Sequence, residues 1–203
     1  MLFRSPLPQN RLAIALGDVS GKGVAAALMM AKFSGDTRYC IHTENSPAAA
    51  AIVLNRLLFN AGIEEKFITL SLSVLDLERK RLIYCSAGHL PLLVRRAGGK
   101  VEELGEEIAG FPLGIMADAE YQQAETTLNP GDVVVVYSDG VTDGRNLREE
   151  LYDSRDHRRL LKRLAESPGK PEAVGRSILQ EIREFSTGHA QTDDITLICF
   201  GPT

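Results

Sequence analysis

Three apolar runs, each beside an aspartate, constrain this chain most strongly. They are residues 11–18 (RLAIALGD), 132–140 (DVVVVYSDG) and 192–200 (TDDITLICF). Short runs and alternations of apolar residues predict β-strands, so Asp18 and Asp139 follow their strands whereas Asp193 precedes its own. If the last strand runs antiparallel to the other two, all three carboxylates gather at one edge of a sheet.

Three carboxylates held close together repel one another unless protons or a cation neutralise them. Either their pKa values rise or a divalent cation binds them. Oxygen ligands favour a hard ion such as Mg²⁺ or Mn²⁺, and no pair of Cys or His residues has the spacing of a zinc site. The pattern therefore predicts a carboxylate metal site that activates water. The alternative is a set of ordinary strand-end aspartates, because Asp is common at turns.

Composition excludes several classes of protein. The chain has 203 residues, 44% hydrophobic and 25% charged, which is typical of a soluble globular domain. Its net charge of -4 argues against general nucleic-acid binding. Three widely spaced cysteines, Cys40, Cys85 and Cys199, fit a reducing cytoplasm. No segment approaches the ~20 apolar residues that span a bilayer, and none resembles a signal peptide, so we expect a cytoplasmic protein with no membrane partner.

A glycine-rich segment at residues 17–23 (GDVSGKG) leads into the apolar stretch 24–33, which predicts a largely buried helix. A nucleotide-binding Walker loop is disfavoured, because that motif needs four residues between its first Gly and its Gly-Lys pair. A glycine turn into a helix N-terminus can still hold an anion. We therefore predict that Gly21, Lys22 and Gly23 bind a phosphoryl group of the substrate beside the metal.

The remaining elements predict an α+β fold. Ser46 and Pro47 open a helix through residues 48–60. Strands are expected at residues 67–75, 81–86, 90–95 and 100–104, as an antiparallel meander, then at 121–127 and from 133, and helices near 155–166 and 171–186 precede the last strand. This order does not alternate as in a parallel doubly wound fold, so antiparallel sheets covered by helices are predicted.

Three residues near these elements need separate interpretation. Gly140 allows a backbone or a substrate to approach the Asp139 carboxylate closely. We expect Asp143 to stand at the N-terminus of the helix that follows Asp139. His89 is alone in a hairpin, where a histidine is more often structural or exposed than a catalytic base.

Six segments occur in a fixed order along the chain. They are GDVSGKGVAAALMMA, FITLSLSVLD, YCSAGHLPLLV, GFPLGI, GDVVVVYSDGVTDGRN and QTDDITLI. Together they resemble the phosphatase domain of the stage II sporulation protein E family, which is related to the protein phosphatase 2C superfamily. The resemblance implies a four-layer α/β/β/α sandwich of two antiparallel sheets flanked by helices. It also implies Mn²⁺- or Mg²⁺-dependent hydrolysis of phosphoserine or phosphothreonine on a protein, by a metal-activated water.

The resemblance also implies roles for individual residues. Asp18 resembles the family's bridging metal ligand, with the Val19 carbonyl as a contact of a second ion. Asp139 and Asp193 resemble the other ligands of the first ion, and Asp194 neighbours them. Asp18, Asp139 and Asp193 then form the catalytic set around one or two ions. Bacterial relatives often act on phosphorylated anti-anti-sigma factors in stress or sporulation signalling, so the implied partner is a phosphorylated regulatory protein.

One departure concerns the N-terminus. Family members carry a further strand, ending in a Gly-Asp motif, before the strand at residues 11–18. We expect residues 1–203 to form a single phosphatase domain that is truncated at its N-terminus and lacks that first strand and first acidic motif. The alternative function is then a catalytically impaired module that binds a regulatory partner. An unpaired sheet edge would also be open to a second copy of the chain, as a homodimer.

Overall fold

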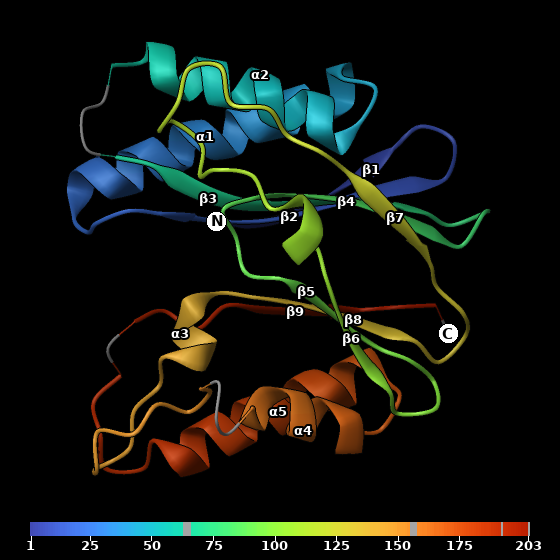
Figure 1. Ribbon diagram of the computed structural model, residues 1–203, viewed down its shortest axis with the longest axis vertical. Coiled ribbons are helices and arrows are strands. Elements are labelled where there is room, and N and C mark those ends of the chain that lie inside the picture. The colour runs from blue at the N-terminus through green and yellow to red at the C-terminus, as the bar shows by residue number, and fades with distance from the viewer. Residues whose placement is uncertain (63–65, 155–157, 192, 203) are drawn as a thin grey trace. The chain divides into compact units, whose positions relative to one another are not determined.

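The chain forms two antiparallel sheets, each with helices on one face (Figure 1). The computed structural model describes residues 1–62, 66–154, 158–191 and 193–202. One compact unit contains Met1–Pro91 and Gly105–Thr127, and the other contains Leu92–Leu104 and Leu128–Thr203. The predicted α+β class, with two antiparallel sheets flanked by helices, is confirmed. No helix in the described ranges is long and apolar enough to cross a membrane.

The first unit is built on a five-stranded sheet in the order β1-β2-β3-β4-β7. Its strands are β1 (Leu2–Leu7), β2 (Arg11–Val19), β3 (Ile68–Asp76), β4 (Arg81–Ala87) and β7 (Ala124–Thr127). Helices α1 (Val24–Thr43) and α2 (Pro47–Asn60) cover this sheet, and the short helix η1 (Glu106–Ile108) precedes β7. Fully buried side chains such as Leu54, Ile68 and Leu72 fill the core between them. Each stabilises the unit by ~1.5–3 kcal/mol through the hydrophobic effect.

The second unit is built on a four-stranded sheet in the order β6-β5-β8-β9. Its strands are β5 (Leu92–Arg95), β6 (Val101–Leu104), β8 (Val133–Tyr137) and β9 (Leu197–Phe200). The four-residue helix α3 (Asp139–Thr142) follows β8, and α4 (Arg159–Glu166) and α5 (Pro171–Phe185) pack on the sheet. Val174, Ile178 and Ile182 recur every four residues along α5 and are buried. This spacing places them on one stripe of the helix, which forms the core of the unit.

Helix α2 follows the predicted capping chemistry. The side chain of Ser46 accepts a hydrogen bond from the backbone N–H of Ala49 at 3.2 Å. Pro47 occupies the first turn, where its missing N–H leaves no helical hydrogen bond unmade. The prediction for this helix is confirmed to within one residue at its start.

Helix α1 corrects two expectations. It continues past residue 33 to Thr43, and only six of its 20 residues are buried, so it is not a largely buried helix. Val24 and Leu28 are 77% and 68% exposed. A helix that lies on one face of a sheet buries a single stripe, and apolar composition does not report which residues lie on that stripe.

The predicted meander corresponds to strands of two different sheets. β3 pairs with β4 in the five-stranded sheet, whereas β5 pairs with β6 in the four-stranded sheet. The physical reason is that β4 is bordered by β3 on one side and by β7 on the other. β5 therefore has no free edge of β4 to join, and it pairs with β8 instead.

The N-terminal residues also differ from expectation. Leu2–Leu7 form β1, which pairs antiparallel with β2 from Leu2 opposite Leu16 to Leu7 opposite Arg11. The expectation that the strand before β2 is lacking is therefore wrong. A turn at residues 8–10, with positive φ angles at Gln9 and Asn10, is short enough to leave room for this strand. The part of the prediction that concerns the acidic motif is unaffected, because residues 1–17 contain no Asp or Glu.

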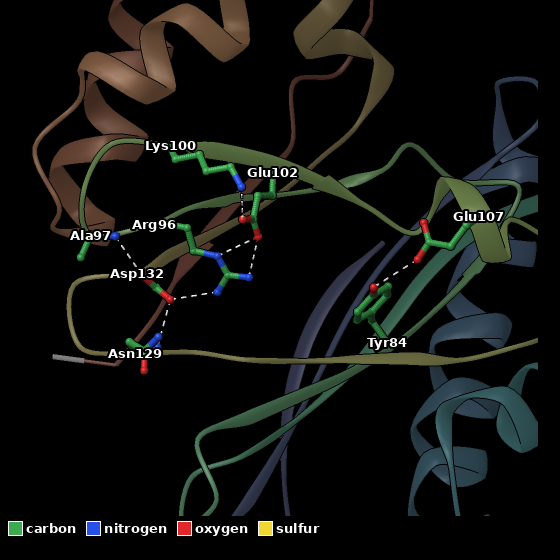
Figure 2. A network of polar contacts seen from close by, with 8 residues as sticks. All are labelled: Tyr84, Arg96, Ala97, Lys100, Glu102, Glu107, Asn129 and Asp132. Atoms are coloured by element: carbon green, nitrogen blue, oxygen red, sulfur yellow. Dashed lines mark hydrogen bonds and ion pairs between the residues drawn. The ribbon is translucent and has the colours of Figure 1, made fainter.

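A partly buried ion-pair network fastens the β5–β6 hairpin to the turn before β8 (Figure 2). Asp132, 2% exposed, accepts hydrogen bonds from Arg96 at 3.0 Å and from the backbone N–H groups of Ala97 and Asn129 at 2.9 and 3.0 Å. Arg96 also pairs with Glu102 at 2.6 Å. Burial alone would raise the pKa of Asp132, but these donors outweigh burial and hold the pKa below its ordinary value of 3.8. The carboxylate is therefore a structural anion.

Candidate functional site

Two of the predicted acidic segments lie at one edge of the four-stranded sheet. β8 and β9 are antiparallel neighbours, with Tyr137 opposite Leu197. The chain that leaves β8 and the chain that enters β9 therefore meet at the same edge. Asp139, Asp193 and Asp194 all lie there, and all three are exposed. The predicted convergence is confirmed for these residues.

Ser138 joins the two acidic segments directly. Its backbone N–H donates to the Thr196 carbonyl at 3.0 Å, and its hydroxyl donates to the Asp194 carbonyl at 3.1 Å. The same hydroxyl accepts from the Thr196 N–H at 3.0 Å. Ser138 is buried, so these bonds are shielded from water and hold the start of α3 against the segment that carries Asp194. Sequence reasoning missed this residue, although its place directly before Asp139 was a signal.

Gly140 is required by the close approach of the same two segments. A Cβ atom added at Gly140 would lie 2.3 Å from the Asp194 carbonyl oxygen and 2.9 Å from its carbonyl carbon. Both atoms belong to the backbone, so no side-chain rotation could relieve the contact. A backbone does approach Gly140 closely, and it is that of Asp194; the predicted approach to the Asp139 carboxylate stays a prediction.

For the phosphatase activity that the sequence resemblance implies, we expect Gly140→Ala to lower kcat/KM for phosphate release from a phosphoserine peptide between about 10- and 100-fold, because a ~1 Å misplacement of a reacting group costs up to ~100-fold. The matched control is Gly175→Ala on α5, where the added Cβ would meet its nearest neighbour, Cys199 Sγ, at an ordinary 3.4 Å. Steady-state kinetics of the two variants checks the prediction. Equal activities in the two variants would contradict it.

Asp143 lies at the end of α3 and not at a helix start, so that expectation is wrong. Helix α3 begins at Asp139 itself, and the Asp143 N–H donates to the Asp139 carbonyl at 2.8 Å. The Asp143 carboxylate accepts from the Thr142 hydroxyl at 3.2 Å. Helix α3 starts just after the strand and has only four residues, so Asp143 follows its end and does not begin a helix.

Asp18 belongs to the other sheet. It lies near the end of β2, opposite Thr69 on β3, and it is exposed, with Val19 as the last residue of the strand. The expectation that all three aspartates share one sheet edge is therefore wrong for Asp18. Strand order decides this outcome, because β2 pairs with β1 and β3, and β8 pairs with β5 and β9.

The glycine loop forms a sharp entry into α1. Gly21 and Gly23 have φ angles of +90° and +88°, a region that favours glycine. Gly23 caps α1, and among the residues that the structure describes no side chain caps the free N–H groups of its first turn. Lys22 is exposed, and Lys66 donates to the Ser20 carbonyl at 3.1 Å beside Gly21. The loop thus carries positive charge from two lysines, of which Lys66 had no signal in the sequence.

His89 is a buried structural residue, in agreement with the more common behaviour of a lone histidine. Its Nδ1 lies 2.9 Å from the Thr69 hydroxyl, and its carbonyl accepts from the Ser86 hydroxyl at 3.0 Å. Because Thr69 stands opposite Asp18, His89 supports the strand that borders this aspartate.

The donor chemistry of the acidic residues fits a hard divalent cation. Exposed carboxylates at strand ends are the ligands that Mg²⁺ and Mn²⁺ prefer. The Asp193 carboxylate accepts from the Asp194 N–H at 2.7 Å, which orients it. Within the described ranges, no group of three or more His, Cys, Asp or Glu side chains is placed to hold a metal ion. The full ligand set, with Asp18 and the Val19 carbonyl, stays a prediction.

Two antiparallel sheets with flanking helices and strand-end aspartates define the fold of the protein phosphatase 2C (PP2C) class. The SiaA PP2C domain of Pseudomonas aeruginosa has this fold, with a TM-score of 0.82, 24% sequence identity, and coverage of 100% of this chain and 80% of that chain. The model of the stage II sporulation protein E (SpoIIE) family matches residues 8–202, and the chain belongs to this family.

Curated relatives extend the comparison. Phosphoserine phosphatase RsbU of Bacillus subtilis is 33% identical over 138 residues, which cover 68% of this chain and 41% of RsbU. Protein IcfG of Synechocystis sp. is 29% identical over 219 residues, which cover 95% of this chain and 34% of IcfG. The chain therefore spans between about a third and two fifths of the length of these two relatives.

Proposed function

We propose that this chain is a metal-dependent protein serine/threonine phosphatase that hydrolyses phosphoserine or phosphothreonine on a regulatory protein. The observation that carries the proposal is the pair of acidic segments that Ser138 and Gly140 hold together at the end of β8. Membership of the SpoIIE family and the likeness to RsbU, which is named a phosphoserine phosphatase, support this choice of reaction.

The proposed metal ligands are Asp18, Asp139 and Asp193, with the Val19 carbonyl and Asp194 as further oxygen donors. One or two Mn²⁺ or Mg²⁺ ions, when bound, supply a water of lowered pKa and neutralise the phosphoryl oxygens. Asp18, Asp139 and Asp193 are the proposed catalytic residues, because they hold the reacting groups in position. Ser138 is a positioning residue, since its hydroxyl bonds the backbone beside two of these carboxylates.

Gly21, Lys22 and Gly23 are the proposed binding residues for the phosphoryl group. The first-turn N–H groups of α1, which no described side chain caps, are available to an anion, and the dipole of a 20-residue helix favours negative charge at that end. Lys66 adds a second ammonium group beside the loop. The loop can therefore orient a dianionic phosphoryl group without contributing a nucleophile.

A phosphorylated regulatory protein is the proposed partner, and an anti-anti-sigma factor is the specific candidate. The proposed location is the cytoplasm. Free cysteines support it, because Cys40 and Cys85 are buried thiols without a disulfide, and burial raises their pKa to about 11 and about 12. Such thiols are inert and behave as small apolar groups. A homodimer and an N-terminally truncated single domain stay predictions.

Removal of the metal tests the proposal. We expect phosphate release from a phosphoserine peptide to fall to background in EDTA and to return when Mn²⁺ or Mg²⁺ is restored, because the proposed nucleophile is a water whose pKa a bound ion lowers. Calorimetric titration with Mn²⁺ measures binding in the same preparation, and thermal unfolding shows that the chelated protein stays folded. Tight binding of a phosphorylated partner in EDTA, with no turnover under any metal, would instead establish a catalytically impaired binding module.

A further inference from the structure

A cavity of about 200 Å³ lies beside the acidic edge, inside the second unit. Its polar lining consists of Arg145, Arg183, Ser186, His189, Gln191 and Asp193. These residues come from the segment after α3, from the end of α5 and its following residue, and from the loop before β9. Gly140 and Asp193 belong both to this lining and to the acidic edge, so an occupant of the cavity would lie next to the proposed reaction site.

The charge of the lining favours an anion. Arg145 and Arg183 contribute two guanidinium groups to the lining, and Asp193 contributes a carboxylate. Arg145 and His189 share the exposed carboxylate of Glu149, at 3.7 and 3.2 Å. Arg183 forms no recorded ion pair with any residue in the described part of the chain, so its guanidinium is available to an incoming group. A guanidinium fork matches a carboxylate better than any other side chain does.

A hydroxyl group that makes no hydrogen bond to any described residue is a second and independent observation. Ser186 Oγ is shielded from solvent and has no hydrogen-bond partner among the described residues. A shielded hydroxyl without a partner costs free energy, and because Ser186 lines the cavity, an acceptor that displaces the atoms now covering the hydroxyl would recover it. Gly144 keeps the space beside it open, because a Cβ there would lie 3.3 Å from Ser186 Oγ.

We propose that this cavity binds an acidic side chain of the phosphoprotein substrate, close to the phosphorylated residue, with Arg183 as the main specificity determinant. Ser186 donates a hydrogen bond to the same carboxylate, and Arg145 adds positive charge. The volume of about 200 Å³ agrees with a single bound side chain, because it is smaller than the ~300–1,000 Å³ that is usual for a small-molecule pocket. The proposal rests on the proposed phosphatase function, and it deepens that function by naming a feature of the substrate.

The test compares phosphoserine peptides that carry either Glu or Gln at each flanking position in turn, with Mn²⁺ present. We expect the wild-type protein to prefer Glu at one position by about tenfold in kcat/KM, the usual strength of one charge-assisted hydrogen bond. Arg183→Gln is expected to reduce this preference to near unity. The matched control is Arg176→Gln, on the same helix, whose side chain pairs with exposed Glu172 and does not line the cavity. That variant should keep the wild-type preference.

Several outcomes separate the possible failures. The absence of any Glu preference in the wild type, or a preference that survives Arg183→Gln, would overturn the proposal. In another outcome, Arg183→Gln weakens inhibition by inorganic phosphate by the same factor by which it reduces the Glu preference. That result would also overturn the proposal, since the cavity would then hold phosphate itself. If no peptide is hydrolysed, the phosphatase function has failed. Fluorescence anisotropy of the same Glu and Gln peptides then decides the cavity's role without turnover.

Discussion

Asp139→Asn is expected to lower kcat/KM for a phosphoserine peptide by ~1,000-fold, the upper range for loss of one preorganised electrostatic group. The Asp139 side chain is exposed at the first residue of α3, so the isosteric change removes a charge and leaves the packing intact. A neutral amide is a much poorer ligand for a hard divalent ion than a carboxylate is. Phosphate release under saturating Mn²⁺, together with Mn²⁺ titration by calorimetry, measures both consequences.

The matched control is Asp143→Asn. Asp143 is a second exposed carboxylate, directly after the same short helix, and it accepts a hydrogen bond from Thr142. This variant should retain activity to within about twofold, since surface substitutions of this kind change free energies by less than ~0.5 kcal/mol. Unchanged Mn²⁺-dependent turnover in Asp139→Asn, or equal losses in both variants, would remove Asp139 from the ligand set.

Asp132→Ala is expected to lower the free energy of unfolding by about 3 kcal/mol. The substitution removes a buried carboxylate acceptor of three hydrogen bonds, one of them from the charged Arg96, and leaves the N–H groups of Ala97 and Asn129 without their acceptor. Urea unfolding followed by circular dichroism measures the change. The control is Glu172→Ala, which breaks an exposed ion pair with Arg176 and should cost less than ~1 kcal/mol. Equal effects would contradict a structural role for the buried network.

Acid should diminish the difference in the free energy of unfolding between the wild type and Asp132→Ala. The pKa of Asp132 in the folded protein lies below its ordinary value of 3.8, so the carboxylate stabilises the fold fully at pH values above ~4. The contribution is lost as the pH falls through the folded-state pKa, because protonation then favours neither state. The stability gap between wild type and Asp132→Ala should therefore be constant from neutral pH to about pH 5 and shrink below pH 4. A gap that persists unchanged in acid would show that the charge of Asp132 is unimportant.

Local elements could be predicted well because short-range chemistry decides them. The cap at Ser46 and the proline that follows it define the start of α2, and the apolar runs define β2 and β8. The position of Asp139 and Asp193 at one sheet edge followed from one assumption, that the last strand runs antiparallel to its neighbour. The six motif segments identified the SpoIIE family, which the family comparison confirms.

Partners distant in the chain could not be predicted. The hydroxyl of Ser138 reaches a carbonyl 56 residues later, and Lys66 reaches the carbonyl of Ser20 across 46 residues. No local pattern encodes such pairs. The cavity that contains Arg145, Arg183 and Ser186 was equally invisible, because its walls come from three separate segments.

The sequence by itself determined where most helices and strands form and which carboxylates end the strands, because dihedral preference, capping and apolar periodicity act over a few residues. Only the tertiary structure decided that Asp18 and Asp139 belong to different sheets and that β5 pairs in a different sheet from β4. It also decided which stripe of α1 is buried. These outcomes depend on which edge or face remains free after other elements have packed, and that competition is settled by contacts between residues far apart in the chain.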